Sequence, residues 1–282
     1  MTTRRSFIKQ TSLFSLAAFA NPSSLTYKQH AVGLQLYTLR DDIMKDPKGI
    51  IEKVAALGYN EVESFGYRDG KYFGLTPAEF ATLLKNNKLS HPSGHYLLAN
   101  LNNNWEKTVE DAVTAGQKYI IIAYLFDTER KTIDDYKKIA AQFNKAAEVC
   151  KKAGIQFGYH NHDFEFIDMG GQKGYDILLK ETDPQLVKFE LDLYWISYAG
   201  INPVDMFKAN PGRYPLWHVK DMDNTPKKFF TEVGNGVIDF KKVFAAARTA
   251  GMKHFFVEQD VCPGPPLVSI EKSISYLRKN IL

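Results

Sequence analysis

The chain has 282 residues, of which 44% are hydrophobic, and its formal charge is +4 at pH 7. This length is sufficient for one large domain with a sizeable core. Residues 1–20 contain Arg4, Arg5 and Lys9 but no acidic residue, so the remainder carries a formal charge of only +1. Such a nearly neutral body gives no electrostatic reason to expect nucleic acid or an anionic membrane as a partner.

The N-terminal segment has the pattern of an export signal. Residues 3–9 read TRRSFIK, which resembles a twin-arginine motif, and a modest apolar stretch follows as far as Ala20. The small residues Ala18 and Ala20 offer a cleavage site. We therefore predict a signal peptide over 1–20, a linker over 21–29 and one domain over 30–282, with a periplasmic or exported location. A disordered tail with two chance arginines is the alternative. No later segment has the ~20 apolar residues of a spanning helix, so we expect no membrane association after cleavage.

Short apolar runs and amphipathic segments alternate along the rest of the chain. The expected strands are 32–37, 60–65, 90–96, 119–124, 155–160, 187–192, 215–220 and 254–258. The expected helices are 47–57, 77–87, 104–115, 133–152, 174–181, 203–209, 240–250 and 267–281. Eight such alternations predict a parallel sheet covered by helices, and their number favours a single closed (β/α)8 TIM barrel.

Local signals mark the helix boundaries. A glycine follows the end of four of the expected helices, at Gly58, Gly116, Gly154 and Gly251. Thr76, Thr132 and Asp239 stand where a side-chain cap would begin a helix. After the first strand Gly33 stands alone, with no Gly-x-Gly-x-x-Gly pattern, which makes a dinucleotide-binding fold improbable.

Four of the apolar runs end at or near an ionisable residue. These are His160, Asp192, His218 and Glu258, one on each of the last four expected strands. Taken singly, each is more simply a hydrogen-bonded boundary residue or a helix cap. Because parallel strands of a barrel converge at its carboxyl end, the four together predict one metal site. Two imidazoles and two carboxylates suit Mn²⁺ best among divalent metals, with Mg²⁺, Co²⁺, Fe²⁺ or Zn²⁺ as alternatives.

Residues two apart on a strand share a face, so each ionisable strand end carries a second polar candidate. Glu63, His162, Glu190, Lys220 and Asp260 are such positions, and Glu61 is interpreted as a solvated strand start at the bottom of the barrel. His95 ends the third strand. Aromatic side chains near the same end, namely Tyr37, Tyr96, Tyr194, Trp195, Phe229 and Phe230, either pack or offer flat faces to a sugar.

The chain resembles the xylose isomerase-like TIM barrel superfamily, often labelled sugar phosphate isomerase/epimerase, over roughly residues 30–282. The resemblance rests on the motifs YHNHDFEF (159–166), FELDLYWI (189–196), WHVKDMD (217–223) and FVEQD (256–260). In tagatose-type epimerases of this superfamily the metal ligands close the last four strands in the order Glu, Asp, His, Glu. Asp192, His218 and Glu258 match, whereas His160 stands where those enzymes have a Glu that also acts as acid/base.

Comparison with two other branches of the superfamily narrows the choice of expected reaction. The His-Asn-His and His-Val-Lys-Asp runs look closer to inosose dehydratase-like members, which eliminate water beside a ketone. A nuclease of the endonuclease IV branch is improbable, because Trp195 stands where that branch has His and a basic groove is absent.

The resemblance implies a metal-dependent isomerase or epimerase that abstracts a proton next to the carbonyl of a sugar or keto-sugar. The expected base is His162, or Glu63 or Glu190 if they face inward, and Lys220 would donate a proton to a developing oxyanion. His95, Tyr37, Trp195 and Phe229 are the expected substrate contacts. An exported 3-keto-glycoside lyase or dehydratase that acts by β-elimination, and a catalytically silent sugar-binding barrel, are the alternatives.

The two cysteines, Cys150 and Cys262, do not make a disulfide framework. Cys150 is expected as a small core residue of its helix and Cys262 in a loop. The sequence does not require them to pair.

Overall fold

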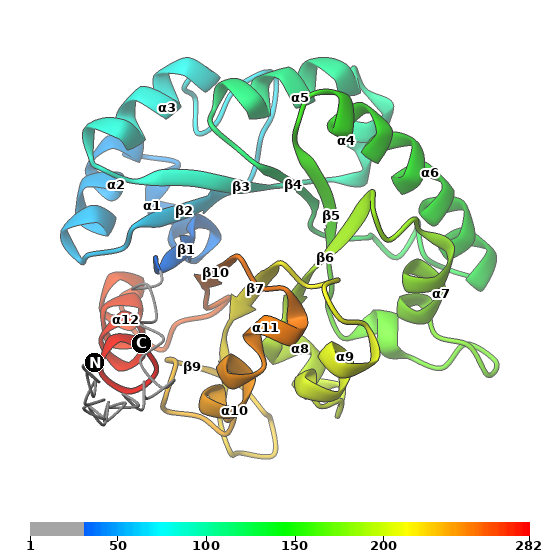
Figure 1. The fold of residues 1–282 in the computed structure, drawn as a ribbon. Coiled ribbons are helices and arrows are strands. Elements are labelled where there is room, and N and C mark those ends of the chain that lie inside the picture. The colour runs from blue at the N-terminus through cyan, green and yellow to red at the C-terminus, as the bar shows by residue number, and fades with distance from the viewer. Residues whose placement is uncertain (1–30) are drawn as a thin grey trace, which may run out of the picture. The chain divides into compact units, whose positions relative to one another are not determined.

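The structure is a computed structural model that describes residues 31–282, and within them eight parallel strands close into a barrel (Figure 1). The strands are β1 (Gly33–Gln35), β2 (Glu61–Ser64), β3 (Ser90–Tyr96), β4 (Tyr119–Ile122), β5 (Gln156–His160), β6 (Val187–Asp192), β7 (Leu216–Val219) and β10 (His254–Val257). Each pairs with the next barrel strand along the chain, and β10 closes the circle by pairing with β1. The predicted (β/α)8 barrel is confirmed.

Helices surround the strands (Figure 1). The main ones are α2 (Pro47–Ala56), α3 (Pro77–Asn86), α5 (Trp105–Thr114), α6 (Ile133–Lys152), α7 (Gly174–Glu181), α9 (Pro203–Ala209), α10 (Phe240–Ala245), α11 (Ala247–Ala250) and α12 (Pro266–Asn280). Helices were predicted at all of these places. The expected single helix over 240–250 is, however, two short helices that meet at Ala246.

The predicted helix boundaries agree with the structure. The four glycines that follow helices all have φ between 73° and 91°, the left-handed region that ends a helix without a steric cost. Thr76 and Thr132 each form a complete capping box, and the Asp239 side chain accepts the backbone N–H of Lys242. The N-caps mark where strand-to-helix loops end, and the glycines mark where helix-to-strand loops begin. The strand-to-helix loops surround the mouth of the barrel.

The loops contain short elements that periodicity did not predict. They are η1 (Leu36–Leu39), α1 (Arg40–Ile43), α4 (Leu98–Asn102), η2 (Phe164–Phe166), α8 (Leu193–Tyr198) and the two-stranded hairpin of β8 (Asp221–Met222) and β9 (Phe230–Thr231). The first strand is accordingly shorter than expected, because the 3-10 helix η1 takes over at Leu36. Most of these elements are at the carboxyl ends of strands, where they shape the candidate site.

The interior of the barrel is divided into an apolar plug and a polar layer. Ile121, Leu216 and Phe256 are almost fully buried and form a small cluster separate from the large core between strands and helices. Glu63 on β2, Glu190 on β6 and His218 on β7 are fully inaccessible to solvent. These polar side chains are therefore held inside the barrel together with the apolar cluster.

The expectation that Glu61 is solvated is wrong. It lies at the start of β2, as predicted, but it is 8% exposed rather than solvated. Its Oε2 lies 2.7 Å from Nδ1 of His254 at the start of β10, and its Oε1 accepts a hydrogen bond from Ser90. The twist of the closed sheet brings the start of β10 beside that of β2, so this carboxylate has an imidazole partner at the bottom of the barrel.

The predicted signal peptide and linker lie outside the described residues. Within 31–282 no helix combines the length and apolarity needed to cross a membrane. Cys150 is buried in α6, Cys262 is partly exposed after β10, and both are free thiols.

Candidate metal and substrate site

The four residues predicted as metal ligands lie together at the carboxyl end of the barrel. His160 and Asp192 end β5 and β6, His218 is the third residue of β7, and Glu258 directly follows β10. One ligand atom from each lies within 4.8 Å of the corresponding atoms of the other three, and all four side chains are buried. Their assembly follows from strand register, because Asp192 pairs with His218 across neighbouring strands.

Hydrogen bonds fix both histidine rings with one nitrogen free to face the cluster. Nδ1 of His160 lies 3.2 Å from the carbonyl oxygen of Ala123, which can only accept, so Nε2 faces Asp192 with its lone pair. Nε2 of His218 lies 2.6 Å from Oε2 of Glu63, and its Nδ1 faces Glu258. Metal-binding histidines are typically held this way, with the second nitrogen donating to a carbonyl or carboxylate.

The donor atoms fit a shared divalent cation. Oδ2 of Asp192 lies 3.2 Å from Nε2 of His160 and 3.8 Å from Nδ1 of His218, and the latter lies 2.7 Å from Oε2 of Glu258. The first two separations fall within the roughly 3–4 Å expected between ligands at about 2.1 Å from one cation, and the third is slightly shorter. Among the described residues neither Nδ1 of His218 nor Oε2 of Glu258 has a properly aligned hydrogen-bond partner. Two buried atoms that face each other without a hydrogen bond are suitably placed to share a metal ion.

Lys220 adds a positive charge beside the cluster. Its Nζ lies 3.0 Å from Oδ2 of Asp192, 2.6 Å from Oε2 of Glu258 and 2.9 Å from Oδ2 of Asp260. The side chain is almost fully buried, and burial alone would lower its pKa. The three carboxylates outweigh that effect and raise the pKa of Lys220 well above its usual value. The ammonium group is therefore charged and oriented toward the site.

A second group of ligand-type side chains lies deeper in the barrel. Glu63, His95, Glu190 and His218 also gather within 4.8 Å. Here the carboxylates are engaged: Oε2 of Glu63 accepts from Gln35 at 2.8 Å, and Oε2 of Glu190 lies 2.6 Å from Nε2 of His95. Glu63 and Glu190 face inward, as one alternative required, but they do not line the cavity above. This deeper group supports the rings of His95 and His218.

A cavity of about 450 Å³ opens directly onto the candidate cluster. Six of the residues predicted to form the site line it, namely Tyr37, His95, His160, His162, Lys220 and Glu258. Its size is in the range of small-molecule sites, and its walls are mostly aromatic. A compact polar ligand with flat apolar faces would fit these walls.

His162 is an ionisable residue in the wall of the cavity. Its ring packs edge-on against Tyr124 at 4.9 Å and lies 5.5 Å from Trp195. Its buried Nδ1 has no hydrogen-bond partner among the described residues. Burial, followed by the charge of Lys220, lowers the pKa of His162 to about 3, so the ring is neutral at pH 7.

Burial and neighbouring charges also shift the pKa values of the other ionisable groups at the site. Burial lowers the pKa of His95 to about 4 and raises that of Glu190 to about 7. Burial opposes the charged form of His218, but Glu190 and Glu258 outweigh it and raise the pKa of that ring. Burial also raises the pKa of Asp260 to about 6, despite the opposing effect of Lys220.

Two expected substrate contacts are not part of the cavity wall. Trp195 stands behind His162, and its buried indole N–H has no partner among the described residues. Phe229 is 45% exposed, while its neighbour Phe230 stacks on Tyr194 with ring centres 4.3 Å apart. The hairpin of β8 and β9 therefore directs Phe230, rather than Phe229, toward the aromatic packing near the site.

Several lining residues were not proposed as site residues from the sequence. From the sequence, Asp260 was noted only because it stands two residues after Glu258 and so shares a strand face with it. Phe65, Tyr124 and Phe126 line the cavity from the segments that follow β2 and β4. An aromatic residue just past a strand end was the signal available for all three, but it does not distinguish a cavity wall from core packing.

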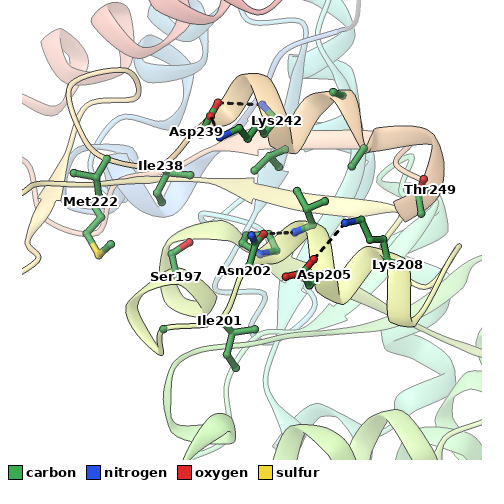
Figure 2. Close-up of a pocket in the computed structure, with 17 residues that line it drawn as sticks. Ser197, Ile201, Asn202, Asp205, Lys208, Met222, Ile238, Asp239, Lys242 and Thr249 are labelled. Carbon is green, nitrogen blue, oxygen red and sulfur yellow. Dashed lines mark hydrogen bonds and ion pairs between the residues drawn. The ribbon is translucent and has the colours of Figure 1, made fainter.

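A different hollow, between α9 and the α10–α11 pair, contains none of these residues (Figure 2). Its polar contacts are local: Asn202 caps α9, Asp205 pairs with Lys208 at 3.4 Å, and Asp239 pairs with Lys242 at 3.1 Å. Each charged group is satisfied on its own helix, so no set of polar groups converges there. The barrel mouth is the better candidate site.

Comparison with known proteins defines the family. The sequence profile of the xylose isomerase-like TIM barrel family matches residues 51–280. The chain therefore belongs to this family.

Individual relatives are more distant. An inosose dehydratase of Geobacillus thermodenitrificans is 26% identical over 167 residues, which are 52% of this chain and 55% of that protein. The chain thus spans about half the length of the curated relatives it matches. The structure of a sugar phosphate isomerase/epimerase from Parabacteroides distasonis superimposes with a TM-score of 0.78 at 27% identity, covering 91% of this chain and 96% of that one. The IolI protein, solved with a zinc atom, shares the fold at a TM-score of 0.69 and 14% identity, covering 88% of this chain and 97% of that one.

Proposed function

We propose that this protein is a divalent-metal-dependent enzyme that removes a proton from the carbon next to a carbonyl in a sugar or keto-sugar. The observation that carries the proposal is the convergence of His160, Asp192, His218 and Glu258 beside a cavity of sugar-accommodating size. The sugar isomerase/epimerase and inosose dehydratase names among its relatives support the same class of reaction.

The four converging side chains would hold the metal. Two nitrogen and two oxygen donors suit Mn²⁺, Co²⁺, Fe²⁺ or Zn²⁺, and the zinc atom of the similarly folded IolI protein supports a transition metal. Such an ion supplies Lewis-acid polarisation of the substrate carbonyl. Glu63 holds the His218 ring through Nε2 and so presents Nδ1 to the cluster.

His162 is the proposed base. Its ring lines the cavity beside the expected ligands and is neutral, so it can accept the proton from the carbon next to the carbonyl. Glu63 and Glu190 are buried beneath the cluster and outside the cavity wall, so they take positioning roles instead. In isomerisation or epimerisation His162 would return the proton to carbon.

β-Elimination is the second candidate, and the pair of Lys220 and Asp260 favours it. After proton removal at one carbon, the C–O bond at the next carbon breaks, and the departing oxygen must take up a proton as the enone forms. The Lys220 ammonium lines the cavity, held 2.9 Å from the Asp260 carboxylate, and can give its proton to the departing oxygen; the proton taken up by His162 then leaves to solvent, and Lys220 regains one from solvent. The inosose dehydratases among the relatives have this reaction in their name. An exported keto-glycoside lyase would combine it with the predicted signal peptide.

Deuterium exchange tests the shared first step. The metal-loaded protein is incubated in D₂O with 3-keto-glucosides and simple ketohexoses, and deuterium next to the carbonyl is measured by NMR. Incorporation that depends on enzyme and metal is the expected result. Binding of these sugars without any exchange or product would overturn the proposal and favour a silent sugar-binding barrel. Lys220→Gln then separates the candidates: it should abolish enone formation by an eliminating enzyme while exchange continues.

A further inference from the structure

A second hollow adjoins the cavity at the barrel mouth. It has a volume of about 910 Å³ and lies between the segment that follows β2 and the segment from the end of β3 into α5. Gly66, His95, Tyr96 and Leu97 line both hollows. The two spaces are therefore neighbours that share a wall, and a ligand seated on the candidate metal cluster could extend directly from one into the other.

The wall of the second hollow carries groups suited to sugar hydroxyls. Three amides, those of Asn100, Asn103 and Asn104, line it from α4 and the start of α5. An amide both donates and accepts hydrogen bonds, as a hydroxyl requires of its partner. Within residues 31–282 the side chains of Asn103 and Asn104 make no hydrogen bond, whereas Asn100 accepts the Leu97 backbone N–H at 2.8 Å.

Most of the charges in this wall are already paired. Asp111, which is 5% exposed, accepts from the Tyr67 hydroxyl at 2.6 Å and forms an ion pair with Lys107. Arg68 and Asp69 lie 3.6 Å apart and are highly exposed. These two pairs leave Lys71 as the one further formal charge among the Lys, Arg, Asp and Glu residues that line the hollow, so the wall suits a neutral polyhydroxylated ligand better than a multiply charged one.

The backbone of this wall is held in uncommon conformations. Asp69 and Asn104 have φ of 53° and 52°, which non-glycine residues rarely adopt, and both line the hollow. The loop after β2 is closed by the bridges between Arg68 and Lys71 and between Tyr72 and Leu75. Such conformations persist where the surrounding structure holds them and are concentrated at ligand-binding sites. Gly66, at the boundary of the two hollows, has open space where a side chain would stand.

From these features we infer that the second hollow is a subsite for a further sugar unit, so that the substrate is a glycoside of two or more units. This inference rests on the proposed function, because the reacting keto-sugar unit must occupy the cavity on the metal cluster. The glycosidic bond then passes over Gly66 and Leu97, and the next unit meets the amides of Asn103 and Asn104.

The test blocks the subsite without touching the cluster. Ala99 is an exposed residue of α4 that lines the second hollow but not the cavity, so Ala99→Trp fills the subsite. Ala141→Trp, at an exposed position of α6 outside both hollows, is the matched control. A second variant, Asn104→Gly, removes one amide and keeps a backbone that tolerates positive φ.

Two probes are compared, a 3-keto-glucose and cellobiose oxidised to the 3-ketone on its non-reducing unit. For deuterium exchange, we expect Ala99→Trp to lower kcat/KM with the disaccharide by about tenfold or more, which corresponds to about 1.4 kcal/mol, and to leave the monosaccharide within about twofold. Asn104→Gly should act in the same direction, and Ala141→Trp should change neither. Equal effects on both probes, or none on either, would overturn the subsite.

Binding separates failure of the subsite from failure of the proposed function. Calorimetric titration with cellobiose and with glucose requires no turnover. If the wild type exchanges neither keto-sugar, the proposed reaction is wrong, but a cellobiose affinity that exceeds that of glucose and is lost in Ala99→Trp still supports the subsite. Equal affinities of the two sugars in the wild type, unaffected by Ala99→Trp, would refute the subsite even in an active enzyme.

Discussion

Nδ1 of His218 lies 2.7 Å from Oε2 of Glu258, yet neither of these buried atoms is aligned with a hydrogen-bond partner among the described residues. The same ring is held through its other nitrogen by Glu63. The Lys220 ammonium lies 2.6 Å from the same carboxylate oxygen, which leaves Nδ1 of His218 without an aligned partner. Leaving a buried polar atom unsatisfied costs about 1–3 kcal/mol, and a divalent cation bound by Nδ1 and Oε2 together would remove that cost.

Replacing Glu258 with Gln should reduce metal content and turnover together. The amide lacks the negative charge of the carboxylate and binds a hard divalent cation weakly. Elemental analysis of the purified variant and the deuterium-exchange rate measure the two effects. Glu61→Gln is the control, because this buried carboxylate lies at the opposite end of the barrel. Full metal content with unchanged activity in Glu258→Gln would remove this residue from the site.

Replacing Glu63 with Gln should weaken metal binding although Glu63 does not reach the cavity. The carboxylate accepts from Nε2 of His218, whereas an amide can also present N–H groups and stabilise the wrong tautomer. Loss of such a supporting partner typically costs about 10- to 100-fold in metal affinity or activity. A metal titration measures the affinity, and excess metal should restore much of the rate. An unchanged affinity would show that the ring needs no such support.

Replacing His162 with Asn should lower the exchange rate without releasing the metal. A positioned general base contributes about 10²- to 10⁴-fold to the rate, and His162 is not among the four expected ligands. His254→Asn, at the bottom of the barrel, serves as the control. Wild-type exchange in His162→Asn would assign the base to another residue, and loss of metal would instead make His162 a ligand.

The buried carboxyl group of Glu165 should make the stability of the protein depend on pH. It is fully buried, its Oε2 accepts the His162 backbone N–H at 2.9 Å, and burial raises its pKa from 4.5 to about 7. The folded protein therefore holds this proton more tightly than the unfolded chain does. The stabilisation is complete below pH 4.5 and is lost as the pH rises through about 7.

Glu165→Gln isolates this effect because the amide does not titrate. Between about pH 4.5 and pH 8, the free energy of unfolding of the wild type should fall by up to roughly 3 kcal/mol relative to the variant. Denaturant unfolding at several pH values measures the difference. A constant difference across this range would show that Glu165 does not titrate there.

The barrel and the convergence of the four expected ligands were predictable because both follow from strand periodicity. Each ligand position lies at or next to the carboxyl end of a strand, and parallel strands place these ends on one rim. The burial of Glu61 was not predictable, because its partner His254 stands 193 residues away and becomes a neighbour only when β10 closes on β1.

The wall of the cavity was harder to predict for a related reason. Periodicity describes strands and helices, whereas η1, α4 and α8 are short elements within loops, and their side chains depend on tertiary packing. Phe229 and Phe230 illustrate the difficulty: adjacent aromatic residues on a hairpin face opposite ways, and only the position of Tyr194 determines which one packs near the site.

The most direct test is anomalous diffraction from crystals of the protein soaked in Mn²⁺. We predict one strong peak at about 2.1–2.3 Å from the four donor atoms of His160, Asp192, His218 and Glu258. A peak in the deeper group of Glu63, His95 and Glu190, or no peak in the barrel from metal-saturated protein, would contradict the proposed metal site.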